Sequence, residues 1–126
     1  MTQVQTMTNP ELNRALAELM GYTTVKDKYD VITLYKNGEK LRGWWTHTEE
    51  NAWAYAPDYC TDPTASLEVQ TAAIKLNAVV YVANLQLIKF HRSNGLSSRE
   101  DVAVLMDSSP RERAEAAYIT LSQVRE

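Results

Sequence analysis

Residue types that build covalent links or phosphate-binding loops are scarce in this sequence. Cys60 is the only cysteine, which excludes a disulfide within the chain and a zinc site made of thiolates. The four glycines are scattered along the chain, so no glycine-rich loop is present to hold a phosphate group. We therefore expect no metal site and no cofactor.

Signals for export and membrane insertion are also missing. The first eight residues, MTQVQTMT, lack the positive start and the apolar run of a signal peptide. The most apolar stretch, near Ala78, is interrupted by Asn84 and Gln86 before it reaches spanning length. Together with the single cysteine, these features favour the reducing cytoplasm and no membrane partner.

The chain has no strong excess of either charge. It carries 13 Lys and Arg against 16 Asp and Glu, a net charge of -3. A duplex nucleic-acid binder normally presents a basic stripe that displaces counterions from phosphates, so direct duplex binding is not expected. A total of 126 residues suits one domain. We expect a flexible N-terminal tail at residues 1–8 and a single domain at residues 9–126.

Three helix starts repeat one pattern, in which a capping residue precedes proline and an amphipathic run. They are Asn9-Pro10, Asp62-Pro63 and Ser109-Pro110. Gly21 can supply the left-handed position that ends the first helix. Glu112 has capping-box spacing from Ser109. These signals predict one helix after each proline.

Alternating and β-branched segments predict strands between and after these helices. Residues 31–36 alternate and meet Asn37-Gly38, a strong hairpin-turn signal, so we expect a second arm at residues 39–46. Residues 51–55 and 102–106 are also predicted as strands. The apolar run from Ala78 to Phe90 favours a strand as well. One long helix continuing from Pro63 remains the alternative for that run, because Ile74, Ala78, Val82 and Leu85 sit at helical intervals.

The order of these elements indicates an α+β fold. Hairpin connections dominate, so the sheet should be mainly antiparallel, with helices packed on both faces as an alpha/beta/alpha sandwich.

No group of side chains has the spacing of a catalytic centre. His47 and His91 lack partners at triad or metal-ligand spacing, and a surface role explains each of them. Cys60 could act as a nucleophile only if a histidine lay beside it, and a small buried filler is the simpler interpretation. We therefore expect that the protein is not an enzyme.

One aromatic segment stands out as a candidate binding site. All three tryptophans, Trp44, Trp45 and Trp53, fall close together, and Tyr55 and Tyr59 follow. Exposed aromatic rings stack on bases and anchor protein contacts. We predict a binding site made of these five residues and His47. The alternative is that both sheet faces are covered and every ring belongs to the core.

Short motifs in the sequence resemble the phage ABA sandwich domain family. They are Met20-Gly21-Tyr22 and residues 57–62, PDYCTD, followed by Ala65, Glu68 and Val69. The resemblance extends to the order of elements and to an alanine-rich closing helix. It implies an alpha/beta/alpha sandwich and a phage or prophage setting, and it carries no catalytic residues over to this chain.

A non-enzymatic counter-defence protein is therefore the leading hypothesis. Its partner would be a host defence protein, such as the nuclease effector of a CRISPR complex, or a nucleotide immune signal. The alternatives are a small accessory enzyme or nucleic-acid-processing factor acting through Cys60 or His47, and a structural assembly protein. A homodimer also stays open, because binding proteins of this size build pockets at two-fold interfaces.

Overall fold

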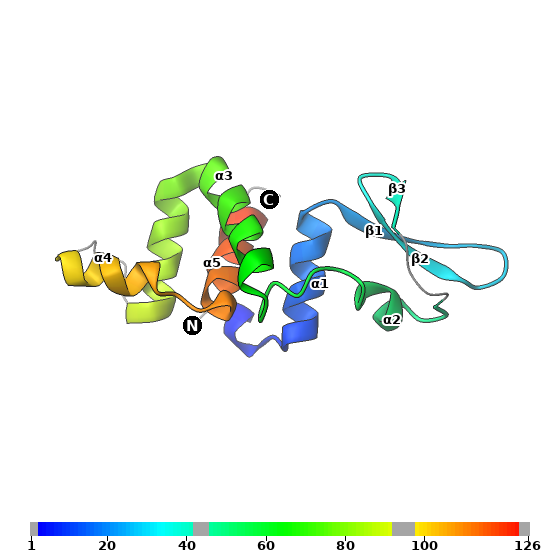
Figure 1. Cartoon of the computed structure of the whole chain (residues 1–126), viewed down its shortest axis with the longest axis horizontal. Coiled ribbons are helices and arrows are strands. Elements are labelled where there is room, and N and C mark those ends of the chain that lie inside the picture. The colour runs from blue at the N-terminus through cyan, green and yellow to red at the C-terminus, as the bar shows by residue number, and fades with distance from the viewer. Residues whose placement is uncertain (1–2, 42–45, 92–97, 124–126) are drawn as a thin grey trace.

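Helices form most of the molecule, and a small sheet extends from one side of them (Figure 1). The computed structural model describes residues 3–41, 46–91 and 98–123. The elements in chain order are the 3-10 helix η1 (Gln3–Thr6), α1 (Asn9–Leu19), β1 (Tyr22–Lys26), β2 (Ile32–Lys36), β3 (Glu39–Lys40), α2 (Glu49–Trp53), α3 (Pro63–Phe90), α4 (Arg99–Met106) and α5 (Pro110–Gln123).

The three predicted proline-initiated helices are confirmed. In α1 the cap is Thr8, one residue earlier than predicted, and it forms a capping box with Glu11. The Glu11 carboxylate accepts from the Thr8 N–H at 2.8 Å, and the Thr8 hydroxyl accepts from the Glu11 N–H at 3.3 Å. Gly21 follows with φ of 99°, as predicted for the residue that ends this helix. Asp62 caps α3, and Ser109 pairs with Glu112 at the start of α5.

The strand predicted at residues 78–90 is wrong, because this run is the second half of α3. Asn77, with φ of −163° and ψ of 95°, breaks α3 into two helices. Its side chain accepts from the Val80 N–H at 3.1 Å and so caps the second half. Tyr81 and Leu85 then face inward from the same side of the helix. The alternative of a helix continuing from Pro63 is therefore the observed one, with a break that reverses the chain (Figure 1).

The strands predicted at residues 51–55 and 102–106 are also wrong. The Thr48 hydroxyl accepts from the Asn51 N–H at 3.1 Å and starts α2, and Ser98 caps α4 through the Asp101 N–H at 3.2 Å. Acidic residues fill the first turn of both helices, where the helix dipole favours negative charge. In predicted segments of five residues, these local capping bonds favour a helix more strongly than an alternating pattern favours a strand.

The predicted hairpin at Asn37-Gly38 is confirmed, with φ of 51° and 87° at the two residues. Its second arm is shorter than predicted, since β3 ends at Lys40, although Thr46 makes an isolated bridge with Ile32. β1 is a strand that was not predicted from the sequence; it pairs antiparallel with β2 and completes the order β1-β2-β3. The threonines and valine of β1 are β-branched, and this is the signal that could have found it.

One face of the sheet packs against α2. Tyr22, Ile32 and Leu34 are buried on this face, and the Thr24 hydroxyl donates to the Glu49 carboxylate at 2.9 Å. Val25 lies on the other face and is exposed. The fold is thus α+β with an antiparallel sheet, as predicted. The predicted sandwich, with helices on both faces, is not confirmed.

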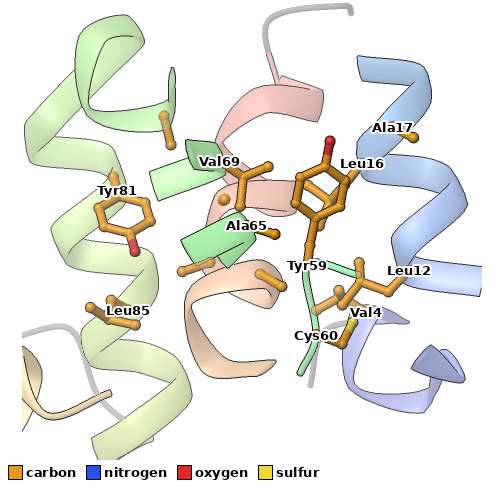
Figure 2. Packing of buried hydrophobic residues seen from close by; sticks show 14 of the residues in the cluster. Val4, Leu12, Leu16, Ala17, Tyr59, Cys60, Ala65, Val69, Tyr81 and Leu85 are labelled. Atoms are coloured by element: carbon orange, nitrogen blue, oxygen red, sulfur yellow. The ribbon is translucent and has the colours of Figure 1, made fainter. Parts of the chain in front are cut away.

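The core lies among the helices, with α5 between α1 and the two halves of α3 (Figure 2). Ala114, Ala116 and Ala117 of α5 have no exposed surface, and such small side chains let neighbouring helices approach closely. Val4, from the segment predicted as a flexible tail, is only 2% exposed and belongs to this core. The N-terminal segment from residue 3 therefore packs with the domain.

Among the described residues, α3 is the one helix long and apolar enough, by length and composition, to cross a membrane. The core helix of a soluble protein can have the same length and composition. The break at Asn77 leaves two halves, neither of which reaches the roughly 20 residues that a spanning helix needs. The cytoplasmic location stays a prediction.

Candidate functional site

The predicted aromatic site is only partly assembled in the structure. Trp44 and Trp45 lie outside the described residues. Tyr59 is 1% exposed and packs in the helical core, where burial raises the pKa of its hydroxyl. Tyr55 is 43% exposed and follows α2. These tyrosines therefore do not share one exposed surface.

His47 lies at the sheet, away from Tyr59. Its Nδ1 is 3.1 Å from the backbone oxygen of Asp30, in the turn that joins β1 to β2. The other histidine, His91, ends α3 in a left-handed conformation with φ of 58°. No three of the described His, Cys, Asp and Glu side chains are grouped closely enough to hold a metal ion.

Trp53 is the predicted site residue that lines a cavity. Its ring is 8% exposed, and its indole N–H donates to the Glu49 carboxylate at 3.0 Å. The Arg14 guanidinium of α1 lies over the ring, 5.0 Å from the ring centre. This cation–π contact connects α1 to α2 and fixes one wall of the cavity.

The cavity is a groove between α1, α2 and the loop that follows α2, and we call it the α1–α2 groove. Its volume is about 630 Å³, and its lining includes Pro10, Glu11, Arg14, Glu50, Trp53 and Asp58. Three carboxylates therefore share the groove with one guanidinium. The groove as a whole favours positive charge.

Two of these carboxylates are held in the ionised form. Hydrogen bonds from the Thr8 N–H and hydroxyl lower the pKa of Glu11. Hydrogen bonds from the Thr61 hydroxyl and from the Asn13 amide, the latter at 2.9 Å, lower the pKa of Asp58 although burial opposes them. Both groups stay negative at neutral pH, because a bond to the charged form stabilises that form.

Cys60 belongs to the loop between α2 and α3, and its side chain lies in the core formed with α1 and α5. It is 3% exposed, and its Sγ is 3.8 Å from the Asn9 carbonyl oxygen and 3.9 Å from the Arg111 guanidinium. Burial raises the pKa of the thiol to about 11, although Arg111 acts in the opposite direction. A thiolate is the reactive form of cysteine. Cys60 therefore has the environment of a small buried side chain that fills space in the core.

We expect Cys60 to resist alkylation in the native protein. At pH 8 the thiol is almost entirely protonated and shielded from solvent. Iodoacetamide should therefore label it at a rate set by opening of the fold, and labelling should accelerate sharply in urea. The rate can be followed by intact mass. Rapid labelling without denaturant, at the speed of a free cysteine peptide, would show that the thiol is accessible.

Many of the exposed large apolar side chains belong to α3 and α4, and those at residues 78–90 and 102–106 fall in segments predicted as strands. We call this set the α3–α4 apolar surface. Val79 is 80% exposed and Met106 is 77% exposed, and the other members are Ile74, Leu76, Val82, Leu87, Val102 and Val104. In Figure 1, α4 projects from the helical body on the side opposite the sheet. Of the apolar residues in α4, Leu105 alone is buried.

Comparisons with family models, with curated proteins and with solved structures found no match to this chain. The resemblance to the phage ABA sandwich domain family therefore stays a prediction, which rests on the short motifs around Gly21 and Asp62.

Proposed function

We propose that this chain is a non-enzymatic binding protein of a phage or prophage that covers and blocks a protein component of host defence, such as a nuclease effector. The α3–α4 apolar surface supports the binding role. The family resemblance supports the phage setting, the host cytoplasm and the sandwich architecture, and all three belong to the same proposal.

An exposed apolar surface of this kind favours a protein partner. The eight exposed apolar side chains of this surface belong to α3 and α4, and exposed apolar area that a partner can cover is typical of interaction sites. Each side chain that a partner covers gains stabilisation from the removal of apolar area from water, at about 25 cal/mol per Å². The most exposed members, Val79 and Met106, have the most to gain.

The α4 helix has the form of a recognition element. It spans Arg99–Met106, and an isolated helix of this length is marginal in water. Among the described residues of α4, Leu105 is the one in the hydrophobic core, so Val102 and Met106, one turn apart on the same helix face, remain open to a partner. A groove on another protein that accepts an amphipathic helix would cover them.

A nucleotide signal is less well supported as the target than a protein. The α1–α2 groove is lined by Glu11, Glu50 and Asp58, and these carboxylates repel phosphate. An enzyme is also less well supported, because Cys60 is buried and His47 contacts the distant turn of the sheet.

The proposal predicts that charge on the apolar surface abolishes blocking. We choose Val79→Asp and Met106→Lys, because Asp suits the first turn of a helix and Lys suits the last, so both changes preserve the helices. In cells that carry a nuclease-based defence system, the unmodified protein should restore phage plating. The double variant should reduce plating to the level without the protein.

A matched control is available on the sheet. Val25 and Tyr29 are 48% and 71% exposed, and Val25→Asp with Tyr29→Lys adds the same charges there. The control should block defence as well as the unmodified protein does. Equal loss in both variants, or none in either, contradicts the proposal. Analytical sedimentation tests the assembly alternative. If the unmodified protein is a dimer and only the Val79 and Met106 variant is a monomer, the surface serves self-association.

A further inference from the structure

The α1–α2 groove is a second, separate feature of the surface. Figure 1 places α1 and α2 toward the sheet, on the other side of the molecule from α4. A groove of about 630 Å³ lies in the range of ligand pockets. It is larger than one amino-acid side chain needs, so it can also take part of the neighbouring backbone.

The start of α1 lines this groove but is not prepared for an anion. Thr8 and Glu11 satisfy each other's backbone N–H groups through the capping box. Pro10 has no backbone N–H to offer. The donor at Pro10 is therefore missing and the donor at Glu11 is occupied, which leaves fewer donors for a phosphate at this helix start.

Arg14 is also committed within the protein. Its guanidinium stacks on Trp53, and its Nε is 3.5 Å from the Glu18 carboxylate. The positive charge in the groove is thus already paired with an acidic side chain and an aromatic ring.

The Glu50 carboxylate, in contrast, has no such partner. It is exposed at the first turn of α2, and no described residue forms a hydrogen bond or ion pair with it. Glu11 already accepts from the Thr8 N–H, yet its carboxylate is exposed and has acceptor sites left for a further donor. These two groups can accept from a planar donor of the guanidinium type.

Apolar groups complete the groove. Pro10, Ala54 and Trp53 lie in its lining beside the carboxylates. The methylene groups of a long basic side chain pack on such a surface while its charged end reaches an acidic group. An arginine side chain matches both features.

We propose that the α1–α2 groove binds an arginine side chain presented by an extended segment of a partner protein. The guanidinium pairs with Glu50 and Glu11, and the methylene groups lie on Pro10 and Ala54. This inference goes beyond the proposed function, because it concerns a different surface and holds for any partner with such a segment.

The test uses the full chain labelled with ¹⁵N and the peptide acetyl-Gly-Leu-Arg-Leu-Gly-amide. We expect the peptide to shift the backbone signals of Glu50, Asn51 and Ala54 and the indole signal of Trp53. The peptide with citrulline in place of arginine keeps the shape and removes the charge, and it should bind about fivefold more weakly. Equal binding of the two, no shift at these residues, or tighter binding of a peptide with glutamate overturns the inference.

Two variants locate the effect. Glu50→Gln should weaken binding of the arginine peptide by about two- to fivefold, the effect of one exposed ion pair. Glu39→Gln makes the same change on exposed β3 and should leave the affinity unaltered. Ala54→Phe places a ring in the groove at an exposed position and should abolish binding. If Glu50→Gln and Ala54→Phe both bind like the unmodified protein, the groove is not the site.

Discussion

Replacing Arg111 with methionine should destabilise the protein by about 2–4 kcal/mol, one of the two largest effects expected from a single change. Arg111 lies in the first turn of α5, and its side chain reaches the N-terminal segment. Its Nε donates to the Glu115 carboxylate at 2.6 Å, and one terminal nitrogen donates to the Asn9 side chain at 2.8 Å. The other terminal nitrogen donates to the backbone oxygens of Val4 at 3.1 Å and Met7 at 2.7 Å.

The cost arises from the groups that methionine leaves without a donor. Glu115 is 8% exposed, and its charge loses the guanidinium beside it. The Met7 carbonyl loses its Arg111 donor, and the Val4 carbonyl keeps only the Met7 N–H at 3.2 Å, where the 3-10 helix packs on the core. A partly buried acceptor without a partner costs about 1–3 kcal/mol. The loss of these bonds should also loosen the packing of Val4.

Urea unfolding followed by circular dichroism at 222 nm measures this effect. Arg99→Met is the matched control, because Arg99 is exposed on α4 and makes no hydrogen bond or ion pair with any other described residue. The control should change the unfolding free energy by less than about 0.5 kcal/mol. If Arg111→Met has an effect no larger than the control, Arg111 does not hold the N-terminal segment on α5.

Replacing Ala117 with leucine should have the other large effect, a loss of about 1–3 kcal/mol or more. Ala117 has no exposed surface and lies on α5, the helix enclosed by α1 and the two halves of α3. A leucine there has no space for its additional atoms, because interiors are packed to the density of organic crystals. The neighbouring helices must move apart to accept it.

Thermal unfolding and the near-ultraviolet circular dichroism of the tyrosines report on this change. Ala103→Leu is the control, because Ala103 is exposed in the middle of α4 and the substitution adds the same atoms in open solvent. We expect a lower melting temperature and weaker near-ultraviolet signal for Ala117→Leu only. Equal stability of the two variants would mean that α5 is not enclosed.

The starts of the main helices and the turn of the hairpin could be predicted because their chemistry is local. A capping oxygen and a proline before an amphipathic run act within one turn, as at Asp62-Pro63 and Ser109-Pro110. Asn37 and Gly38 both adopt positive φ, and this preference is local to these two residue types.

The misassigned segments depend on contacts that the local pattern does not contain. Residues 78–90 contain β-branched side chains that suit a strand, yet Val79 and Val82 are exposed and do not decide the outcome. Tyr81 decides it instead, since it is buried and its hydroxyl donates to Gln70 at 2.8 Å across the break in α3. Tertiary packing therefore overrode the intrinsic preference.

Some features of the candidate sites could likewise be predicted from the sequence, and others could not. Trp53 could be singled out from the sequence because tryptophans are frequent at binding sites. The α1–α2 groove could not, because Arg14 and Trp53 are far apart in the chain and meet only after folding. The α3–α4 apolar surface was missed for another reason, since an apolar run is normally assigned to the core.

The sequence by itself determined a cysteine-poor α+β chain with a hairpin at Asn37-Gly38 and capped helices after Pro10, Pro63 and Pro110. Only the tertiary structure decided that α3 folds back at Asn77 around α5, which aromatic rings are buried, and where apolar side chains remain open. Capping and turn bonds join residues a few positions apart, so the sequence contains them directly. Burial depends on which distant surfaces meet, and that is settled by the packing of the whole chain.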